Sequence, residues 1–168
     1  MSNIHRIGVI SDTHIPSRTV RVPEAALHVF EEAGVELIMH AGDLSTLAVI
    51  DQLQAYAPVA AVQGNVEQPD VVAKLPIKRE LVVGGCTIGL VHILGERKQY
   101  VHNARREFPG ARVVVFGHSH IPCNQDTEGL LLLNPGSATD RRTQPSCTVA
   151  ILTIEEGLPR AEIMALHN

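Results

Sequence analysis

The chain has 168 residues and a formal net charge of −4, with 3% aromatic residues and nine histidines. This length is sufficient for one domain with its own core, and we expect a single domain over residues 1–168. The acidic balance argues against a protein that binds mainly nucleic-acid backbone, although it leaves room for a local basic pocket.

The cysteines and the apolar runs indicate the cellular compartment of the protein. Cys86, Cys123 and Cys147 form no Cys-x-x-Cys pair, and their odd number indicates neither a disulfide framework nor a zinc knuckle. No apolar run reaches the ~18 residues of a membrane span, and the N-terminus lacks a signal-peptide pattern. We therefore expect a cytoplasmic protein without a membrane partner, and the sequence leaves a homo-oligomer open.

The first half of the chain alternates predicted strands and helices. Apolar runs predict buried strands, and apolar residues at helical spacing between Pro and Gly signals predict helices. Ser45 is expected to cap the second helix, which Pro58 closes. The order predicts a parallel sheet with right-handed crossovers. The predicted strands are 4–10, 35–41 and 59–62, and the predicted helices are 23–34 and 45–58.

The second half changes character. Gly84 and Gly85 separate two apolar runs and supply the positive φ of an antiparallel hairpin turn. The charged segment 96–108 has apolar residues at helical spacing, and the continuous apolar run 113–116 predicts a buried strand. Together the two halves predict an α/β protein with mixed sheets. The other predicted strands are 77–83, 86–92, 121–125, 130–133, 147–154 and 159–165.

Five of the predicted strands end in residues of the types that bind metal ions. The carboxyl ends of strands in such sheets meet at one crevice, so these residues are expected to converge. Each one alone has an ordinary explanation as a turn, a helix cap or a buried histidine, but seven at five strand ends indicate a site. The candidate ligands are Asp12, His14, Asp43, Asn65, His92, His118 and His120.

The ligand types constrain the chemistry. Carboxylate, imidazole and amide oxygen without thiolate suit Mn, Fe, Zn or Ni. Seven ligands are too many for one tetrahedral ion, and two ions need a bridging carboxylate and a bridging water of lowered pKa. Two divalent ions offset by two carboxylates and one hydroxide leave about one positive charge, which suits an anionic phosphoester.

The ordered motifs resemble those of a known family. Asp12-x-His14, Gly42-Asp43, Gly64-Asn65, His92 and Gly117-His118-Ser119-His120 resemble, in order, the motifs of the calcineurin-like metallophosphoesterases. The segment 134–137, Asn-Pro-Gly-Ser, is similar to the signature of their small YfcE-like phosphodiesterase branch. The resemblance covers essentially the whole chain and implies a four-layer fold of two facing β-sheets flanked by helices.

The resemblance also implies how the ligands are shared. Asp43 would bridge two divalent ions, expected to be manganese, with nickel, iron or zinc as alternatives. The catalytic residues would be Asp43, Asn65 and His118, and the substrate a small phosphoester. The implied ligands of one ion are Asp12, His14, Asp43 and His120, and those of the other are Asp43, Asn65, His92 and His118.

The chain departs from the family pattern at two positions. Many members carry a histidine after the Gly-Asn pair, which donates a proton to the leaving group, but this chain has Val66 and Glu67. We therefore expect a preference for good leaving groups, or proton donation by water or Glu67. Ile93 stands where relatives often have glycine. Candidates to contact a substrate phosphate are Arg18, Arg141 and Arg142, for which a solvated surface role is equally open.

Two functions of different class follow. The first is a dinuclear metal phosphodiesterase in which a bridging hydroxide attacks phosphorus. The second is a non-catalytic protein-binding scaffold, as in the retromer subunit of the same fold. The complete set of seven ligands favours the enzyme. A Ser or Cys hydrolase lacks its Gly-x-Ser-x-Gly elbow or a suitably placed Cys, and no P-loop is present.

Overall fold

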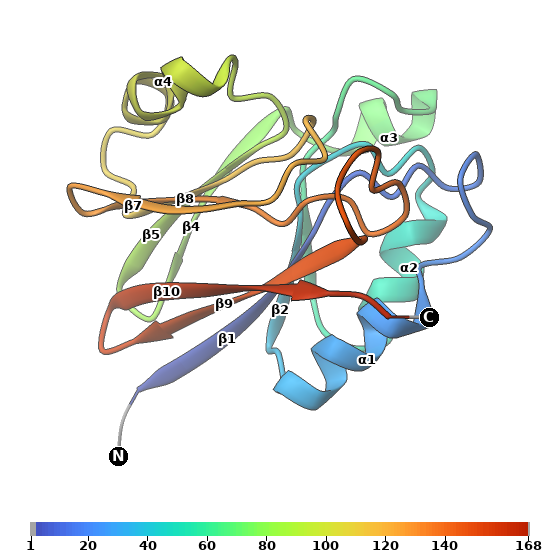
Figure 1. The fold of residues 1–168 in the computed structure, drawn as a ribbon, viewed down its shortest axis with the longest axis horizontal. Helices are drawn as coiled ribbons and strands as arrows, with labels where there is room; N and C mark the ends of the chain where they lie inside the picture. Colours follow the sequence, from blue (N-terminus) through green and yellow to red (C-terminus); the bar gives the residue numbers. More distant parts are fainter. Residues whose placement is uncertain (1–2, 168) are drawn as a thin grey trace.

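Two five-stranded β-sheets face each other in the computed structural model, which describes residues 3–167 (Figure 1). The strands are β1 (Ile4–Ile10), β2 (Leu37–His40), β3 (Val59–Ala61), β4 (Lys78–Val83), β5 (Cys86–Val91), β6 (Val113–Val115), β7 (Cys123–Thr127), β8 (Leu130–Asn134), β9 (Thr148–Glu155) and β10 (Leu158–Ala165). The helices are α1 (Glu24–Ala33), α2 (Ala48–Gln54), α3 (Pro69–Lys74) and α4 (Tyr100–Glu107), the last preceded by the 3-10 turn η1 (Arg97–Gln99).

The sheets and helices form four layers. One sheet has the strand order β10-β9-β1-β2-β3 and the other the order β4-β5-β6-β8-β7. Helices α1 and α2 lie on the outer side of the first sheet, and α4 lies on the outer side of the second (Figure 1). This arrangement confirms the two facing sheets flanked by helices. Residues 1, 2 and 168, at the ends of the expected domain, lie outside the described residues.

Alternation along the strands builds three apolar layers. In β6, Val113 and Val115 pack between the two sheets, whereas Val114 packs with Phe116 under α4. Side chains of a strand alternate between its two faces, so a run that is apolar throughout belongs to a strand covered on both sides. Phe30 of α1 packs in the third layer, against the outer face of the first sheet. The continuous apolar run predicted for this strand is therefore explained by its place between two layers.

Several predicted elements are confirmed. Strands β1, β2 and β3 are parallel, and β4 and β5 form the antiparallel hairpin. Helix α1 ends at Gly34, which has a left-handed φ of 63° and donates its backbone N–H to the last turn. β9 and β10 form the final antiparallel pair.

Other predictions are wrong in detail. Ser45 does not cap α2, because the helix begins three residues later. The φ of Ser45 is 71°, and the backbone N–H of Ser45 donates to Glu67. Strand β7 begins at Cys123, after Pro122, which has no N–H for a ladder. Helix α3 was not predicted, because it has six residues and buries only Val71.

Among residues 3–167, none of the helices has the length and apolar character that a membrane span requires.

Candidate metal centre

The seven predicted ligand residues come together at the carboxyl ends of the strands. Asp12 and His14 follow β1, Asp43 follows β2, and Asn65 follows β3. His92 follows β5 directly, and the two remaining histidines lie in the loop after β6. The ligands thus come from both sheets. Their nitrogen and oxygen atoms form two groups, Asp12, His14 and His120 in one and Asp43, His92 and His118 in the other, with the atoms of each group within 4.8 Å of one another.

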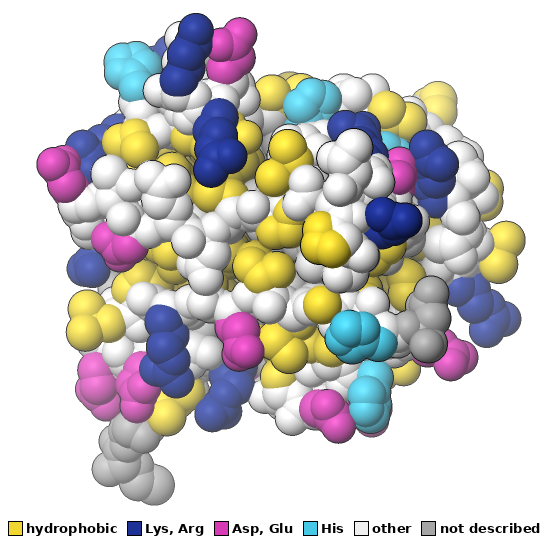
Figure 2. All heavy atoms as spheres, in the orientation of Figure 1, with side chains coloured by type: hydrophobic (Ala, Val, Ile, Leu, Met, Phe, Trp, Pro, Cys, Tyr) yellow, Lys and Arg dark blue, Asp and Glu magenta, His cyan; other side chains and the backbone are white. Residues whose placement is uncertain are grey.

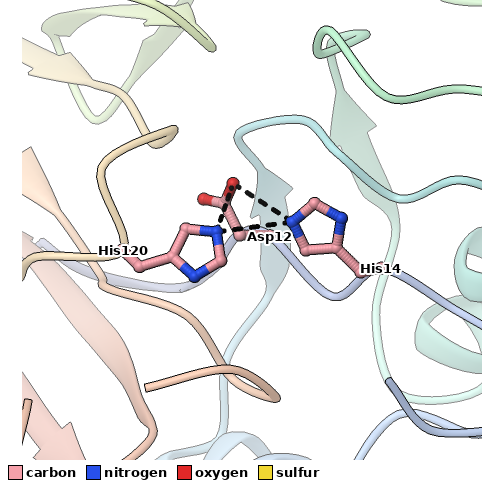
Figure 3. A group of neighbouring side chains, drawn as sticks. All are labelled: Asp12, His14 and His120. Carbon is pink, nitrogen blue, oxygen red and sulfur yellow. Dashed lines mark hydrogen bonds and ion pairs between the residues drawn. The ribbon is translucent and has the colours of Figure 1, made fainter. Parts of the chain in front are cut away.

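The first group converges on a carboxylate oxygen of Asp12 (Figure 3). This oxygen, Oδ1, lies 3.4 Å from His120 Nε2 and 3.8 Å from His14 Nε2. The two imidazole nitrogens lie 3.4 Å apart. Figure 3 shows the three side chains pointing toward one another, Asp12 and His14 from the segment after β1 and His120 from the segment after β6.

The second group gathers around Asn65. The amide oxygen Oδ1 of Asn65 lies 2.9 Å from His92 Nε2 and 3.1 Å from His118 Nδ1. His92 Nε2 also lies 3.2 Å from Asp43 Oδ2. Asn65 and His118 are exposed, whereas Asp43 and His92 are buried, so this group opens to solvent on one side.

Asp43 lies between the two groups. Its Oδ2 is 3.2 Å from His92 Nε2 in the second group and 3.7 Å from His14 Nε2 in the first. Its other oxygen, Oδ1, accepts a hydrogen bond from Val66 N at 2.8 Å. The side chain is therefore oriented with one oxygen facing ligands of both groups.

Backbone carbonyl groups orient the buried histidines. His92 Nδ1 donates to Ala41 O at 2.6 Å, and His120 Nδ1 donates to Asp140 O at 2.7 Å. With the proton on Nδ1, the Nε2 atom of a neutral imidazole carries a lone pair, and this is the atom that faces the centre in both residues. The carbonyl partners thus prepare both histidines to bind a cation.

An unpartnered oxygen tests whether these residues fit a metal ion. Asp12 Oδ2 accepts hydrogen bonds from Ser11 Oγ at 2.7 Å and from His118 N at 3.1 Å. Asp12 Oδ1, in contrast, is buried and accepts no hydrogen bond within the described residues. A buried carboxylate oxygen without a donor is costly unless a cation lies beside it. Because imidazole lone pairs face the same point, the residues fit a divalent metal ion.

The charges of the site shift its pKa values in opposite directions. Burial alone would raise the pKa of Asp12 and Asp43, but their interactions with neighbouring histidines outweigh it and lower both. Burial alone would lower the pKa of His92 and His120. Contacts of His92 with Asp43 and Asp12 raise its pKa, and contacts of His120 with Asp12 and with the backbone carbonyl group of Asp140 raise its pKa. The metal-free centre therefore holds two carboxylates whose negative charge attracts protons or cations.

Most of the ligands have strained backbone conformations. Positive φ values are rare for non-glycine residues and cost roughly 1–2 kcal/mol each. Such strain persists only where the surrounding contacts fix the loops, and it is typical of functional sites. The values are 55° at Asp12, 46° at His14, 58° at Asp43, 74° at His118 and 61° at His120.

Two glycines allow the loops to approach the ligands closely. A Cβ at Gly117 would lie 2.7 Å from Asp12 Oδ2 and closer still to the hydroxyl of Ser11. A Cβ at Gly64 would overlap Asp43 Oδ1. The Gly-His and Gly-Asn motifs therefore place glycine where no side chain fits.

The sequence did not identify His40 as part of the site. His40 is fully buried under the ligand loops; its Nδ1 accepts from Gly42 N at 3.1 Å and its Nε2 lies 3.0 Å from Thr13 Oγ1. Burial lowers the pKa of His40 to about 3. A neutral imidazole thus supports the loops that carry Asp12 and Asp43. The available signal was a histidine inside an otherwise apolar strand.

The three arginines predicted to contact a substrate phosphate differ in the partners of their side chains. Arg18 pairs with Asp140 at 3.1 Å, and Arg141 donates to Gln144 O in its own loop. Arg142 forms no ion pair among residues 3–167, and its positive charge acts on His118 and His120. On the face drawn in Figure 2, basic side chains lie beside histidines near the β8–β9 loop, and charges of both signs are interspersed elsewhere.

Glu67, the other candidate proton donor, is held by the protein backbone. Its two carboxylate oxygens accept backbone hydrogen bonds from Asp43, Ser45 and Gly64. These hydrogen bonds favour the ionised carboxylate, whereas burial is the larger effect and raises the pKa of Glu67. Proton donation by Glu67 therefore stays a prediction.

Residues 6–157 match the calcineurin-like phosphoesterase superfamily domain. The chain belongs to this superfamily. A probable metallophosphoesterase of Methanothermobacter thermautotrophicus is 40% identical over 164 residues, covering 94% of this chain and 91% of that protein. A phosphodiesterase of Methanocaldococcus jannaschii is 25% identical, covering 90% of this chain and 94% of that protein.

A solved structure supports the fold. Vps29 of Entamoeba histolytica, solved in complex with Zn²⁺, has a TM-score of 0.73 and 22% identity, covering 96% of this chain and 99% of that chain. At this identity the likeness shows the fold alone. The chain is thus similar in sequence to a protein named as a phosphodiesterase and in fold to one named for protein sorting.

Proposed function

We propose that this chain is a dinuclear metal-dependent phosphodiesterase. The observation that carries the proposal is the position of Asp43, whose Oδ2 faces ligands of both residue groups. A carboxylate between two ligand groups is what a bridged pair of divalent ions requires. The relatives support a hydrolase of the phosphoesterase family that acts on a small phosphoester.

The proposed ligand sets follow the two groups. One ion would be held by Asp12, His14, Asp43 and His120, and the other by Asp43, Asn65, His92 and His118. When bound, the two ions supply a hydroxide nucleophile at neutral pH and offset charge on the phosphoryl oxygens. Manganese is the proposed ion, and the zinc-bound Vps29 keeps zinc as an alternative.

The chain's own residues position the substrate in this proposal. Asp43 is central to both groups, and Asn65 and His118 are exposed on the open side, where a phosphoester arrives. We assign the catalytic roles to these three residues. Arg142, which forms no ion pair among residues 3–167 and whose charge contributes to lowering the pKa of His118, is the proposed contact for a phosphate oxygen.

The surroundings favour esters with good leaving groups. Val66 follows Asn65 and has no proton to donate, and Glu67 is engaged by backbone N–H groups. The side chains of Val66, Ile93 and Ile121 each follow a ligand residue in the chain and are 49%, 49% and 47% exposed. These apolar side chains suit an aromatic or apolar organic group, and an aryl oxide leaves without a proton from the protein.

The test combines metal analysis with hydrolysis of bis(p-nitrophenyl) phosphate. Purified protein is expected to bind about two ions per chain and to hydrolyse the ester faster with added manganese. Asp43→Asn is expected to abolish turnover, and Asp51→Asn, an exposed substitution on α2, is the matched control. Full turnover by Asp43→Asn in protein that binds two ions would contradict the bridging role.

The alternative is a non-catalytic scaffold, favoured by the likeness to Vps29. The scaffold predicts no turnover under the same conditions, whether or not metal is bound, because the Vps29 neighbour was itself solved with Zn²⁺. The complete set of seven candidate ligand side chains argues against the scaffold, because protein binding does not require them.

The three cysteines are free thiols, which supports the proposed location in a reducing cytoplasm.

A further inference from the structure

Glu67 joins two ligand loops through three backbone hydrogen bonds. Its Oε1 accepts from Ser45 N at 2.7 Å, and its Oε2 accepts from Gly64 N at 2.7 Å and from Asp43 N at 3.2 Å. The first and last of these N–H groups belong to the loop after β2, and the other belongs to the loop after β3. One carboxylate thus holds together the two loops that present Asp43 and Asn65.

The loop after β2 is shaped to bind an anion. Asp43 and Ser45 have φ values of 58° and 71°, with Leu44 between them. Left-handed residues that alternate with others turn backbone N–H groups toward one side and create a concave anion site. In this chain the anion is its own Glu67 carboxylate, and it stabilises a loop conformation that costs energy by itself.

The segment around Glu67 also orients the side chain of Asp43. Val66 N donates to Asp43 Oδ1 at 2.8 Å, which leaves Oδ2 facing His92 and His14. Ser45 Oγ donates to Val66 O at 3.3 Å, and Gln68 N donates to Ser45 O at 3.0 Å. The main chain and the side chain of Asp43 are therefore both held by residues 66–68.

We propose that Glu67 is a positioning residue, whose carboxylate fixes Asp43 and Asn65 in place before a metal ion binds. The inference rests on the proposed function for its consequence in metal binding. Its structural part, the carboxylate clamp, concerns the metal-free protein and is testable alone. The clamp acts through Asp43 and transfers no proton to a substrate.

The first measurement is amide hydrogen exchange of the metal-free protein. In Glu67→Gln the side-chain amide presents N–H groups toward backbone donors, so the amides of Asp43, Ser45 and Gly64 should exchange about tenfold faster or more. Glu80→Gln, an exposed change of the same charge on β4, should leave these amides unchanged. Unchanged exchange in folded Glu67→Gln would overturn the clamp.

The second measurement is manganese binding by titration calorimetry. Residues that orient metal ligands typically change affinity by about 10- to 100-fold, and we expect a loss of this size in Glu67→Gln but not in Glu80→Gln. If the wild type binds no manganese, the proposed function fails while the exchange result still decides the clamp. Wild-type affinity in Glu67→Gln would overturn the positioning role.

The third measurement separates positioning from proton donation. Hydrolysis of phosphodiesters with good and with poor leaving groups should fall by the same factor in Glu67→Gln, because a positioning residue affects both. A loss confined to the poor leaving group would identify Glu67 as the proton donor and overturn the proposal. Glu67→Asp keeps the charge but shortens the reach, and it should show the same changes if Glu67→Gln does not fold.

Discussion

Ser137 Oγ donates a hydrogen bond of 2.8 Å to the carbonyl oxygen of Asp12, although the two residues lie 125 positions apart in the chain. The same hydroxyl accepts from Thr139 N at 3.2 Å and from Asp140 N at 2.9 Å. Asp12 has a φ of 55°, so its backbone needs such support. Ser137 therefore connects the loop after β8 to the ligand loop after β1.

Ser137→Ala should destabilise the protein and loosen the loop that carries Asp12. Removing a buried hydroxyl that makes three hydrogen bonds is expected to lower the free energy of unfolding by about 1–3 kcal/mol. Urea denaturation of the metal-free protein measures this change. Ser146→Ala, in the same loop and without a side-chain hydrogen bond in the described structure, should change the value little. Equal stabilities of the two variants would show that Ser137 does not brace Asp12.

Asp12→Asn should remove one metal ion and keep the other. The unpartnered Oδ1 of Asp12 belongs to the group with His14 and His120, whereas Asp43, His92 and His118 do not require it. Metal analysis should fall from about two ions per chain to about one. In the metal-free variant the pKa of His120 should also fall, because the carboxylate that raises it is gone. Retention of both ions would contradict this assignment.

The clustering of the candidate ligands was predictable because these residues mark the ends of apolar runs. A strand leaves a strong signal in the chain, and a polar residue at its carboxyl end has a defined place in a parallel sheet. Asp12, Asp43 and His92 could be identified by this rule. The rule gives positions along the chain, and it therefore indicated residues that the fold brings together.

The supporting residues were not predictable in the same way. Ser45 matches a helix cap and Glu67 matches an acid near a reaction centre, but the two bind each other across 22 positions. Pairing of β1 with β9 likewise joins the two ends of the chain. Contacts of this kind depend on the tertiary arrangement and leave no periodic pattern in the sequence. The resemblance to the family supplied the layer arrangement, which the local signals alone did not.

His40 should make the metal-free protein sensitive to acid. Burial lowers its pKa from 6.5 to about 3 in the folded state, so the unfolded chain binds one more proton between these values. Stability due to neutral His40 is therefore complete above about pH 6.5 and is lost as the pH falls, by about 1.4 kcal/mol per unit. His40→Gln should reduce the slope of unfolding free energy against pH by about one proton between pH 6 and 4. An unchanged slope would contradict the assignment.

Gly64→Ala should damage the centre without a change of charge. The added Cβ would overlap Asp43 Oδ1 and the backbone of Asp43, so the shared ligand must move. A ligand displaced by about 1 Å can lower turnover by roughly 100-fold. Gly110→Ala is the matched control, because its Cβ would meet nothing within 4 Å. Hydrolysis of bis(p-nitrophenyl) phosphate and manganese titration compare the two variants, and similar behaviour of both would disprove the close approach.

Arg142→Gln should weaken substrate binding, and Arg141→Gln should not. The guanidinium of Arg142 acts on His118 and His120, whereas that of Arg141 donates to Gln144 O in its own loop. A charge-assisted hydrogen bond to phosphate contributes about 1.5–3 kcal/mol, so KM should rise by roughly 10- to 100-fold in Arg142→Gln. Both variants remove one positive charge from the same loop, and their comparison therefore cancels any general loss of attraction for an anion. An equal rise of KM in both would show that the loop attracts phosphate only through its total charge.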